Sequence, residues 1–254
     1  MVCVFVAAYL HVLSLSVGWF TVLGMVSFVL VPGAWLGAWA WDEVAQVLRD
    51  AGHAVHPVTL SGVAERRGVD AGQQEHVRDI VRVVEENDLR DVVLVGHSYA
   101  GVPTGQAAGR IGDRLRRVVY VDSNIPTDGK SFADGWSAEG QAWLRDQLEQ
   151  TGGYWPPLTA EDYVGQDLTD AAIALILERG TPHPGRAVTE PAELVRPIGE
   201  LPTTYLKCLM DGATPSTVVL EQLESPLWEL VELDTGHWPM LSQPEALAKL
   251  LMAV

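Results

Sequence analysis

The sequence predicts an α/β fold, with a mostly parallel sheet flanked by helices and an inserted helical cap. From residue 26 onward, strand-like apolar segments alternate with helix-like segments, which is typical of a parallel sheet. Residues 91–95 are apolar and β-branched without alternation, as expected of a strand buried on both faces. Residues 125–201, between two predicted strands, are rich in Gly, Pro and Trp and predict the cap. The length of 254 residues and a hydrophobic content of 48% allow a large core.

Apolar periodicity, together with turn residues at the ends of the segments, predicts the individual elements. The helix at 73–87 carries Val77, Ile80, Val81 and Val84 at helical spacing. Ser242 and Glu245 have the spacing of a capping box and predict the start of a final helix there. The predicted strands are 26–31, 54–58, 91–95, 117–121, 203–209 and 227–233. The other predicted helices are 39–51, 99–110 and, inside the cap, 138–150 and 170–179.

The composition excludes several classes of protein. A formal charge of −16 argues against a nucleic-acid surface, which needs a basic patch. The two cysteines, Cys3 and Cys208, are far apart and lack metal-ligand spacing, so neither a disulfide framework nor a zinc site is predicted. Reduced thiols and a cytoplasmic location are the expectation.

The N-terminus allows two interpretations. Residues 1–31 contain no Lys, Arg, Asp or Glu and are long enough to span a bilayer. A secretory signal would carry a basic residue near its start, and none is present. The predicted domain spans residues 25–254. Residues 1–24 are either a membrane anchor or an extension of this domain, which includes the case of a wrongly assigned start codon. The second interpretation is favoured, because the segment starting at Met25 already supplies the first core strand.

Ser98 is the candidate nucleophile. It follows the predicted buried strand and precedes a helix rich in Ala and Gly, with Gly96 two residues before it and Ala100 two after. This strand, tight turn and helix is the context of a nucleophile elbow, where small neighbours let strand and helix approach closely. The motif normally ends in Gly, so Ala100 is a small departure.

A serine hydroxyl needs a base, and the base needs an orienting acid. His237 is the candidate base, because it follows the last strand at the sheet edge where the carboxyl ends of the strands meet. Asp211 and Asp122 each follow a strand and compete for the role of the acid. Asp211 is favoured, since it gives the chain order serine, acid, histidine. His97, beside the serine, is interpreted as a packing residue.

Two further sets of residues are predicted to serve the site. Backbone N–H groups of Tyr99 and of Ala34, in the loop after the first strand, are the candidate donors for an oxyanion hole. Trp35 is the neighbour of Ala34 in that loop. The cap covers the strand ends, where ligands bind in α/β sheets, so aromatic residues are candidates to line a substrate pocket. These candidates are Trp35, Trp136, Trp143, Trp155 and Trp238.

Three separated motifs, at residues 29–41, 96–101 and 235–244, resemble the α/β-hydrolase superfamily. Within it, the chain is similar to bacterial esterases and to plant hydroxynitrile lyases and methylesterases, over essentially residues 25–254. The resemblance implies that Ser98, Asp211 and His237 form a triad and that neither a metal nor another cofactor is needed. The chain departs from the family at Pro32, where the family usually has His.

Fold alone does not fix the chemistry. Hydrolysis of a small or medium hydrophobic carboxylic ester through an acyl-enzyme is the leading hypothesis, because acyl transfer needs a triad and two N–H donors. A ligand-binding protein that turns over slowly and a lyase remain alternatives, although Trp238 stands where a cyanohydrin lyase of this kind would carry Lys. Small-molecule esters are the expected partners, with a membrane only if residues 1–24 are an anchor.

Overall fold

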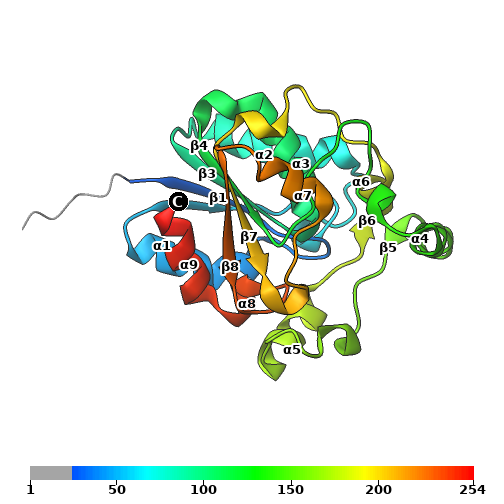
Figure 1. Ribbon diagram of the computed structural model, residues 1–254. Coiled ribbons are helices and arrows are strands. Elements are labelled where there is room, and N and C mark those ends of the chain that lie inside the picture. The colour runs from blue at the N-terminus through cyan, green and yellow to red at the C-terminus, as the bar shows by residue number, and fades with distance from the viewer. Residues whose placement is uncertain (1–24) are drawn as a thin grey trace, which may run out of the picture.

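A six-stranded parallel sheet forms the centre of the protein (Figure 1). The computed structural model describes residues 25–254, so the alternatives for residues 1–24 lie outside the described part of the chain. The strand order is β2-β1-β3-β4-β7-β8, and every neighbouring pair is parallel. The strands are β1 (Ser27–Val31), β2 (Ala54–Pro57), β3 (Val92–His97), β4 (Leu115–Val121), β7 (Thr203–Cys208) and β8 (Trp228–Leu233). All six predicted strands are confirmed, with shifts at their ends.

Helices cover both faces of this sheet, and each face has its own apolar core. Helices α1 (Asp42–Asp50) and α9 (Pro244–Ala253) lie on one face, and α2 (Gln73–Glu86) and α3 (Gly101–Ile111) on the other (Figure 1). Successive β1 side chains alternate between the two cores: Phe28 and Leu30 join the α1/α9 core, while Val29 and Val31 join the α2/α3 core. The continuous apolar pattern of the strands therefore has its predicted cause.

The segment between β4 and β7 contains the predicted helical pieces and a small two-stranded sheet that the sequence did not predict. Helices α4 (Ala138–Gln150) and α5 (Asp170–Arg179) have the expected bounds, and α6 (Gly185–Thr189) follows. Strands β5 (Tyr154–Trp155) and β6 (His183–Pro184) pair antiparallel, with Trp155 opposite His183. Two-residue strands have no periodicity, so only the folded chain reveals them.

The predicted capping box at Ser242 is wrong. Helix α8 (Pro239–Ser242) ends at this serine, and α9 begins at Pro244 with Gln243 before it. The Ser242 hydroxyl instead lies 2.6 Å from the Thr235 hydroxyl and 3.3 Å from the Trp238 carbonyl oxygen, which it binds as a donor. Pro244 suits the first helical position because it has no N–H to satisfy. Helix α7 (Thr217–Gln222), between β7 and β8, was not predicted either.

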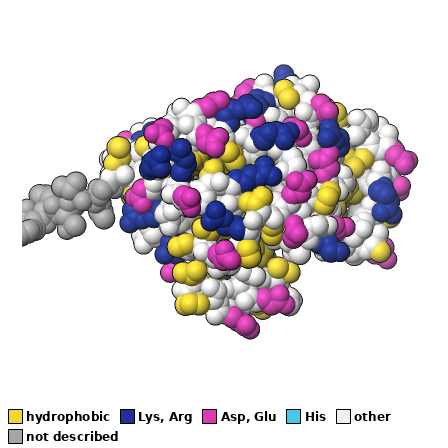
Figure 2. Space-filling view, turned by 90° about the horizontal axis from the view of Figure 1, so that it is seen from above, with side chains coloured by type: hydrophobic (Ala, Val, Ile, Leu, Met, Phe, Trp, Pro, Cys, Tyr) yellow, Lys and Arg dark blue, Asp and Glu magenta, His cyan; other side chains and the backbone are white. Residues whose placement is uncertain are grey.

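The surface carries charged side chains of both signs. Figure 2 shows basic and acidic side chains interspersed over one face, with hydrophobic side chains between them. Within residues 25–254, no helix is both long enough and apolar enough to cross a membrane.

Gly101, at the start of α3, packs too closely against the loop after β4 to tolerate a side chain. A Cβ atom there would lie 2.1 Å from the Asn124 carbonyl oxygen and 2.4 Å from the Ser123 hydroxyl oxygen. We expect Gly101→Ala to lower the free energy of unfolding by about 1–3 kcal/mol through overpacking. Gly135→Ala is the matched control, because a Cβ there meets no atom within 4 Å. Urea denaturation of both variants measures the difference, and equal stabilities would contradict the expected clash.

Candidate active site

Ser98 lies at the turn between β3 and α3, in a backbone conformation that few residues with side chains adopt. Its φ is +55°. Small residues around it make this turn fit: a Cβ on Gly96 would lie 2.5 Å from the Thr104 hydroxyl oxygen, and Ala100 is fully buried. The turn is the elbow that the sequence pattern predicts, and it places the Ser98 hydroxyl above the carboxyl end of the sheet.

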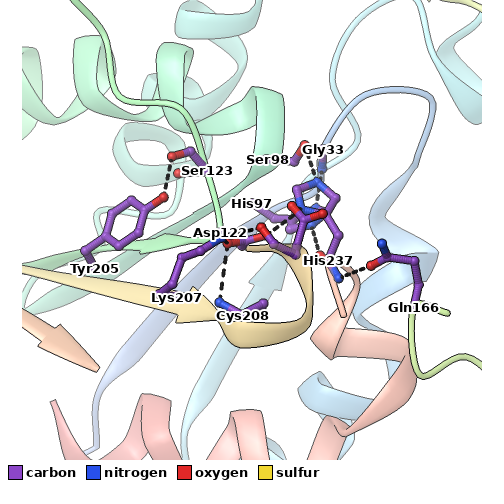
Figure 3. Close-up of polar contacts among 11 residues, drawn as sticks. Gly33, His97, Ser98, Asp122, Ser123, Gln166, Tyr205, Lys207, Cys208 and His237 are labelled. Carbon is purple, nitrogen blue, oxygen red and sulfur yellow. Dashed lines mark hydrogen bonds and ion pairs between the residues drawn. The ribbon is translucent and has the colours of Figure 1, made fainter. Parts of the chain in front are cut away.

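His237 comes from the loop after β8 and reaches Ser98 across 139 positions of sequence. Its Nε2 lies 2.8 Å from Ser98 Oγ, a distance at which the hydroxyl donates to the imidazole (Figure 3). The His237 backbone N–H donates to Gln166 Oε1 in the cap at 2.7 Å. The candidate nucleophile and the candidate base are therefore in hydrogen-bond contact, and the cap helps to fix His237.

Two carboxylates meet the other side of the imidazole. Asp122, directly after β4, has Oδ2 2.7 Å from His237 Nδ1, and Asp211, after β7, has Oδ2 3.3 Å from the same atom. The Asp122 side chain is 2% exposed, whereas that of Asp211 is 41% exposed. The sequence favoured Asp211 over Asp122. The structure brings both to the base, with the shorter and more buried contact from Asp122.

Lys207 on β7 holds the two acid-bearing loops together. Its Nζ donates to Asp122 Oδ1 at 2.5 Å (Figure 3). It also donates to the Asp211 backbone oxygen at 3.0 Å. The Cys208 backbone N–H also donates to Asp122 Oδ1, at 3.3 Å. Asp122 therefore receives two donors on one oxygen and the imidazole on the other, so its orientation is fixed.

These charges determine the protonation of the base. Burial lowers the pKa of His237, but the hydrogen bonds to Asp122 and Asp211 outweigh burial and raise it to about 9. The hydrogen bond from His237 in turn holds the pKa of Asp211 well below its ordinary value, against the opposing effect of burial. The same three side chains offer atoms within 4.8 Å of one another that could ligate a metal. The Lys207 ammonium already balances Asp122, and its charge would repel a cation there.

The loop after β1 passes close to Ser98 and carries the candidate donor Ala34. A Cβ on Gly33 would lie 2.8 Å from Ser98 Cβ, which shows how near the backbones approach. The neighbouring N–H groups of Gly33 and Trp35 donate to His97 Nδ1 and His183 Nδ1, each at 3.3 Å. Within residues 25–254, the Ala34 N–H between them has no partner. It is free to bind an oxygen atom of a ligand at Ser98.

Comparison with known proteins gives the family. Residues 28–250 match the profile described as "Alpha/beta hydrolase family". A carbendazim hydrolyzing esterase from Nocardioides sp. (strain SG-4G) is 30% identical, over 91% of this chain and all of that protein. Methylesterase 9 of Arabidopsis thaliana is 27% identical, over 91% and 98% of the two chains. The chain belongs to the alpha/beta hydrolase family.

Solved structures of alpha/beta hydrolases agree with this fold. An extracellular alpha/beta-hydrolase from a Paenibacillus species, described as sharing homology with tobacco salicylic acid binding protein 2, superposes with a TM-score of 0.79 at 24% identity. It matches 90% of this chain and 98% of its own. Polyneuridine aldehyde esterase gives a TM-score of 0.69 at 21% identity, with coverages of 90% and 98%. The expected superfamily, with its esterase and methylesterase relatives, is confirmed.

The aromatic candidates separate into three groups in this alpha/beta hydrolase. Trp35, Trp136 and Trp155 pack together, with ring centroids 4.2 Å apart for Trp35–Trp155 and 5.3 Å for Trp136–Trp155. Trp143 is 48% exposed on α4 and takes no part in this cluster, so the structure does not place it under the cap. Trp238 packs against His237 and Tyr163, in the core on the α1/α9 face.

A cavity of about 490 Å³ lies beside the loops that carry the two acids. Its lining includes Phe132 and Asn124. The Asn124 backbone N–H donates to the Ser98 carbonyl oxygen at 3.2 Å. Phe132 joins the aromatic cluster, since its ring centroid lies 5.7 Å from that of Trp136. Neither residue was predicted from the sequence, where their only signal is that they follow β4, which ends at Val121. The other lining residues are Val102, Ile125, Pro126, Thr127, Lys130, Ser131, Asp134, Gly135, Ser216, Thr217 and Val218.

His97 contributes more than the packing expected of it. Its Nδ1 accepts from the Gly33 N–H, and its Nε2–H donates to the His237 backbone oxygen at 2.7 Å. Burial keeps the pKa of His97 well below its ordinary value, so the ring is neutral and can accept on one side and donate on the other. His97 therefore joins the loop after β1 to the loop that carries the base.

Proposed function

We propose that this protein is a serine hydrolase that cleaves small or medium hydrophobic carboxylic esters through an acyl-enzyme intermediate. The observation that carries the proposal is the chain of contacts from the Ser98 hydroxyl to His237 Nε2 and from His237 Nδ1 to Asp122, with lengths of 2.8 and 2.7 Å. A nucleophile, a base and an orienting acid in hydrogen-bond contact are the requirements of acyl transfer.

In the first half of the reaction, Ser98 Oγ attacks the ester carbonyl carbon while His237 Nε2 takes the hydroxyl proton. The carbonyl oxygen becomes an oxyanion, which the N–H groups of Ala34 and Tyr99 stabilise as donors. The C–O bond to the leaving alcohol then breaks, and the imidazolium returns its proton to that oxygen. Asp122 keeps the Nδ1 proton facing itself throughout, so Nε2 is the atom that exchanges protons.

In the second half, water replaces the alcohol. His237 removes a proton from the water as it attacks the acyl carbon, and the same two N–H groups bind the second oxyanion. The Ser98–acyl bond breaks, Ser98 Oγ recovers the proton from His237, and a carboxylic acid leaves. Besides the ester and one water molecule, the proposed cycle uses side chains and backbone groups of this chain.

The size and lining of the neighbouring cavity support a small or medium apolar substrate. At about 490 Å³ the cavity falls in the range of ligand pockets, and Ile125, Phe132 and Val218 give it an apolar part. The names of similar proteins also support ester hydrolysis, since they include a carbendazim hydrolyzing esterase and several methylesterases. Trp238, which occupies the position of the lysine expected in a cyanohydrin lyase, argues against that alternative.

A chain-length panel of p-nitrophenyl esters tests the proposal. We expect turnover by the wild-type protein to be greatest for short and medium acyl chains and to be lost in Ser98→Ala. Intact-protein mass spectrometry after quenching should show one acyl group on Ser98. A folded wild-type protein that binds such esters without turning them over would instead favour the ligand-binding alternative.

The pH dependence of hydrolysis follows from the raised pKa of His237. The imidazole must be neutral to take the Ser98 proton, and its pKa of about 9 keeps it charged at lower pH. We therefore expect kcat/KM to rise with pH and to level off above about pH 9, rather than near the ordinary value of 6.5. Asp211→Asn should move this limb to lower pH, because one of the carboxylates that favour the charged ring is removed. A wild-type limb near 6.5 would contradict this account.

A further inference from the structure

Cap residues in and next to the β5–β6 strand pair hold one residue of the loop that carries Ala34 by hydrogen bonds. The Trp35 backbone N–H donates to His183 Nδ1 at 3.3 Å, and the Trp35 carbonyl oxygen accepts from the Thr181 N–H at 3.0 Å. The Trp35 indole Nε1–H donates to the Trp155 carbonyl oxygen at 3.3 Å, and the two indole rings pack 4.2 Å apart. Every polar group of Trp35 is therefore bonded to the cap.

These contacts hold Trp35 in a strained backbone conformation. Its φ is +67°, a left-handed conformation that costs a non-glycine residue about 1 kcal/mol or more and persists only where the surroundings enforce it. The next residue back, Ala34, presents the N–H that has no partner within residues 25–254. The Trp35 N–H belongs to the peptide that joins Ala34 to Trp35, and the Ala34 N–H belongs to the peptide before it. The contact of Trp35 with His183 therefore fixes the chain directly after the donor peptide, and that of Gly33 with His97 fixes it directly before.

The cap residues that bind Trp35 are themselves held in place by further contacts. The Thr181 hydroxyl accepts from the Ala64 backbone N–H at 2.7 Å, which attaches the segment before His183 to the loop after β2. His183 is fully buried, and burial keeps the pKa of its ring well below the ordinary value. The neutral ring keeps Nδ1 as an acceptor, as the Trp35 N–H requires.

We propose that His183 is a positioning residue for catalysis, which acts through Trp35 to hold the Ala34 N–H in place for the oxyanion. The inference rests on the proposed ester hydrolysis and gives the cap a role in the chemical step besides covering the substrate. Two neutral histidines then hold the residues on either side of Ala34. His97, at the end of β3, accepts from the Gly33 N–H, and His183, in the cap, accepts from the Trp35 N–H.

The effect of losing His183 should be kinetic and specific. His183→Leu keeps a similar volume but leaves the Trp35 N–H without an acceptor. The peptide between Ala34 and Trp35 can then turn and displace the adjoining Gly33–Ala34 peptide, which carries the donor N–H. Displacement of an oxyanion donor by about 1 Å costs on the order of 100-fold in rate. We expect kcat for p-nitrophenyl acetate to fall about 10- to 100-fold with little change in KM, because the oxyanion forms only in the transition state.

Two further variants separate positioning from folding. His183→Asn puts an amide oxygen near the place of Nδ1 and should restore most of the lost turnover. His53→Leu is the matched control, since His53 Nδ1 accepts a backbone N–H from Val26 at the opposite end of β1, at 3.4 Å. It removes the same kind of contact away from Ser98 and should leave kcat near the wild-type value.

Steady-state kinetics, thermal unfolding and hydrogen exchange of the Trp35 amide, measured on all four proteins, decide the matter. Faster exchange at Trp35 with reduced kcat in His183→Leu, both reversed in His183→Asn, supports the inference. Unchanged kcat in His183→Leu, or equal losses in the Leu and Asn variants, would overturn it while leaving ester hydrolysis intact. Absence of turnover in the wild type would overturn both proposals, whatever the exchange rates.

Discussion

Replacing Ser98 with alanine is expected to lower kcat for ester hydrolysis by about four to six orders of magnitude. The variant has no hydroxyl to attack the carbonyl carbon, so no acyl-enzyme can form and His237 has no proton to take. The fold should persist, because the change removes one atom whose hydrogen bond is to His237. We expect the free energy of unfolding to change by less than about 1 kcal/mol.

The matched control is Ser123→Ala. Ser123 is buried close to the site, and within residues 25–254 its hydroxyl has no hydrogen-bond partner. Its loss should leave both turnover and stability near the wild-type values. Initial rates with p-nitrophenyl butyrate, corrected for the rate of the ester in buffer, compare the two variants. Substantial turnover by purified Ser98→Ala would show that another group is the nucleophile.

The fold was accessible from the sequence wherever burial imposes a repeating pattern. The inner strands β1 and β3 are covered on both faces and therefore read as nearly continuous apolar runs, and α4 and α5 have the predicted bounds. The pattern failed where structure depends on partners distant in sequence. The pair between Trp155 and His183 is formed by two-residue strands, and Ser242 has a cap-like spacing but bonds to Thr235 instead.

The site divides in the same way. Ser98 and His237 were predicted from local motifs, and the structure places them in contact. The sequence favoured Asp211 from the chain order alone. It could not show which acid lies closer to the imidazole, because both follow parallel strands whose ends meet at the same edge of the sheet. The parts played by Lys207 and His183 were missed, since each acts through contacts that bridge distant segments, 148 positions in the case of His183 and Trp35.

Replacing Asp122, the acid closer to the imidazole, with asparagine is expected to lower kcat by about 10³- to 10⁴-fold. In the wild type, Lys207 Nζ and the Cys208 N–H both donate to Asp122 Oδ1. In the variant these donors would hold the amide oxygen at that place and turn the amide NH₂ toward His237. The imidazole would then accept at Nδ1 and carry its proton on Nε2, where it can no longer take the proton of Ser98.

Asp211→Asn should cost far less, about 10-fold or less, because Asp122 would still accept the Nδ1 proton at 2.7 Å. Asp211 is also half-exposed, so its replacement amide can rotate to present oxygen to the ring. This order reverses the one that strand position in the sequence favours. Saturation kinetics of the two variants, with thermal unfolding to confirm that both are folded, compares them directly. A larger loss in Asp211→Asn would make the exposed carboxylate the working acid and leave Asp122, paired with Lys207, as its support.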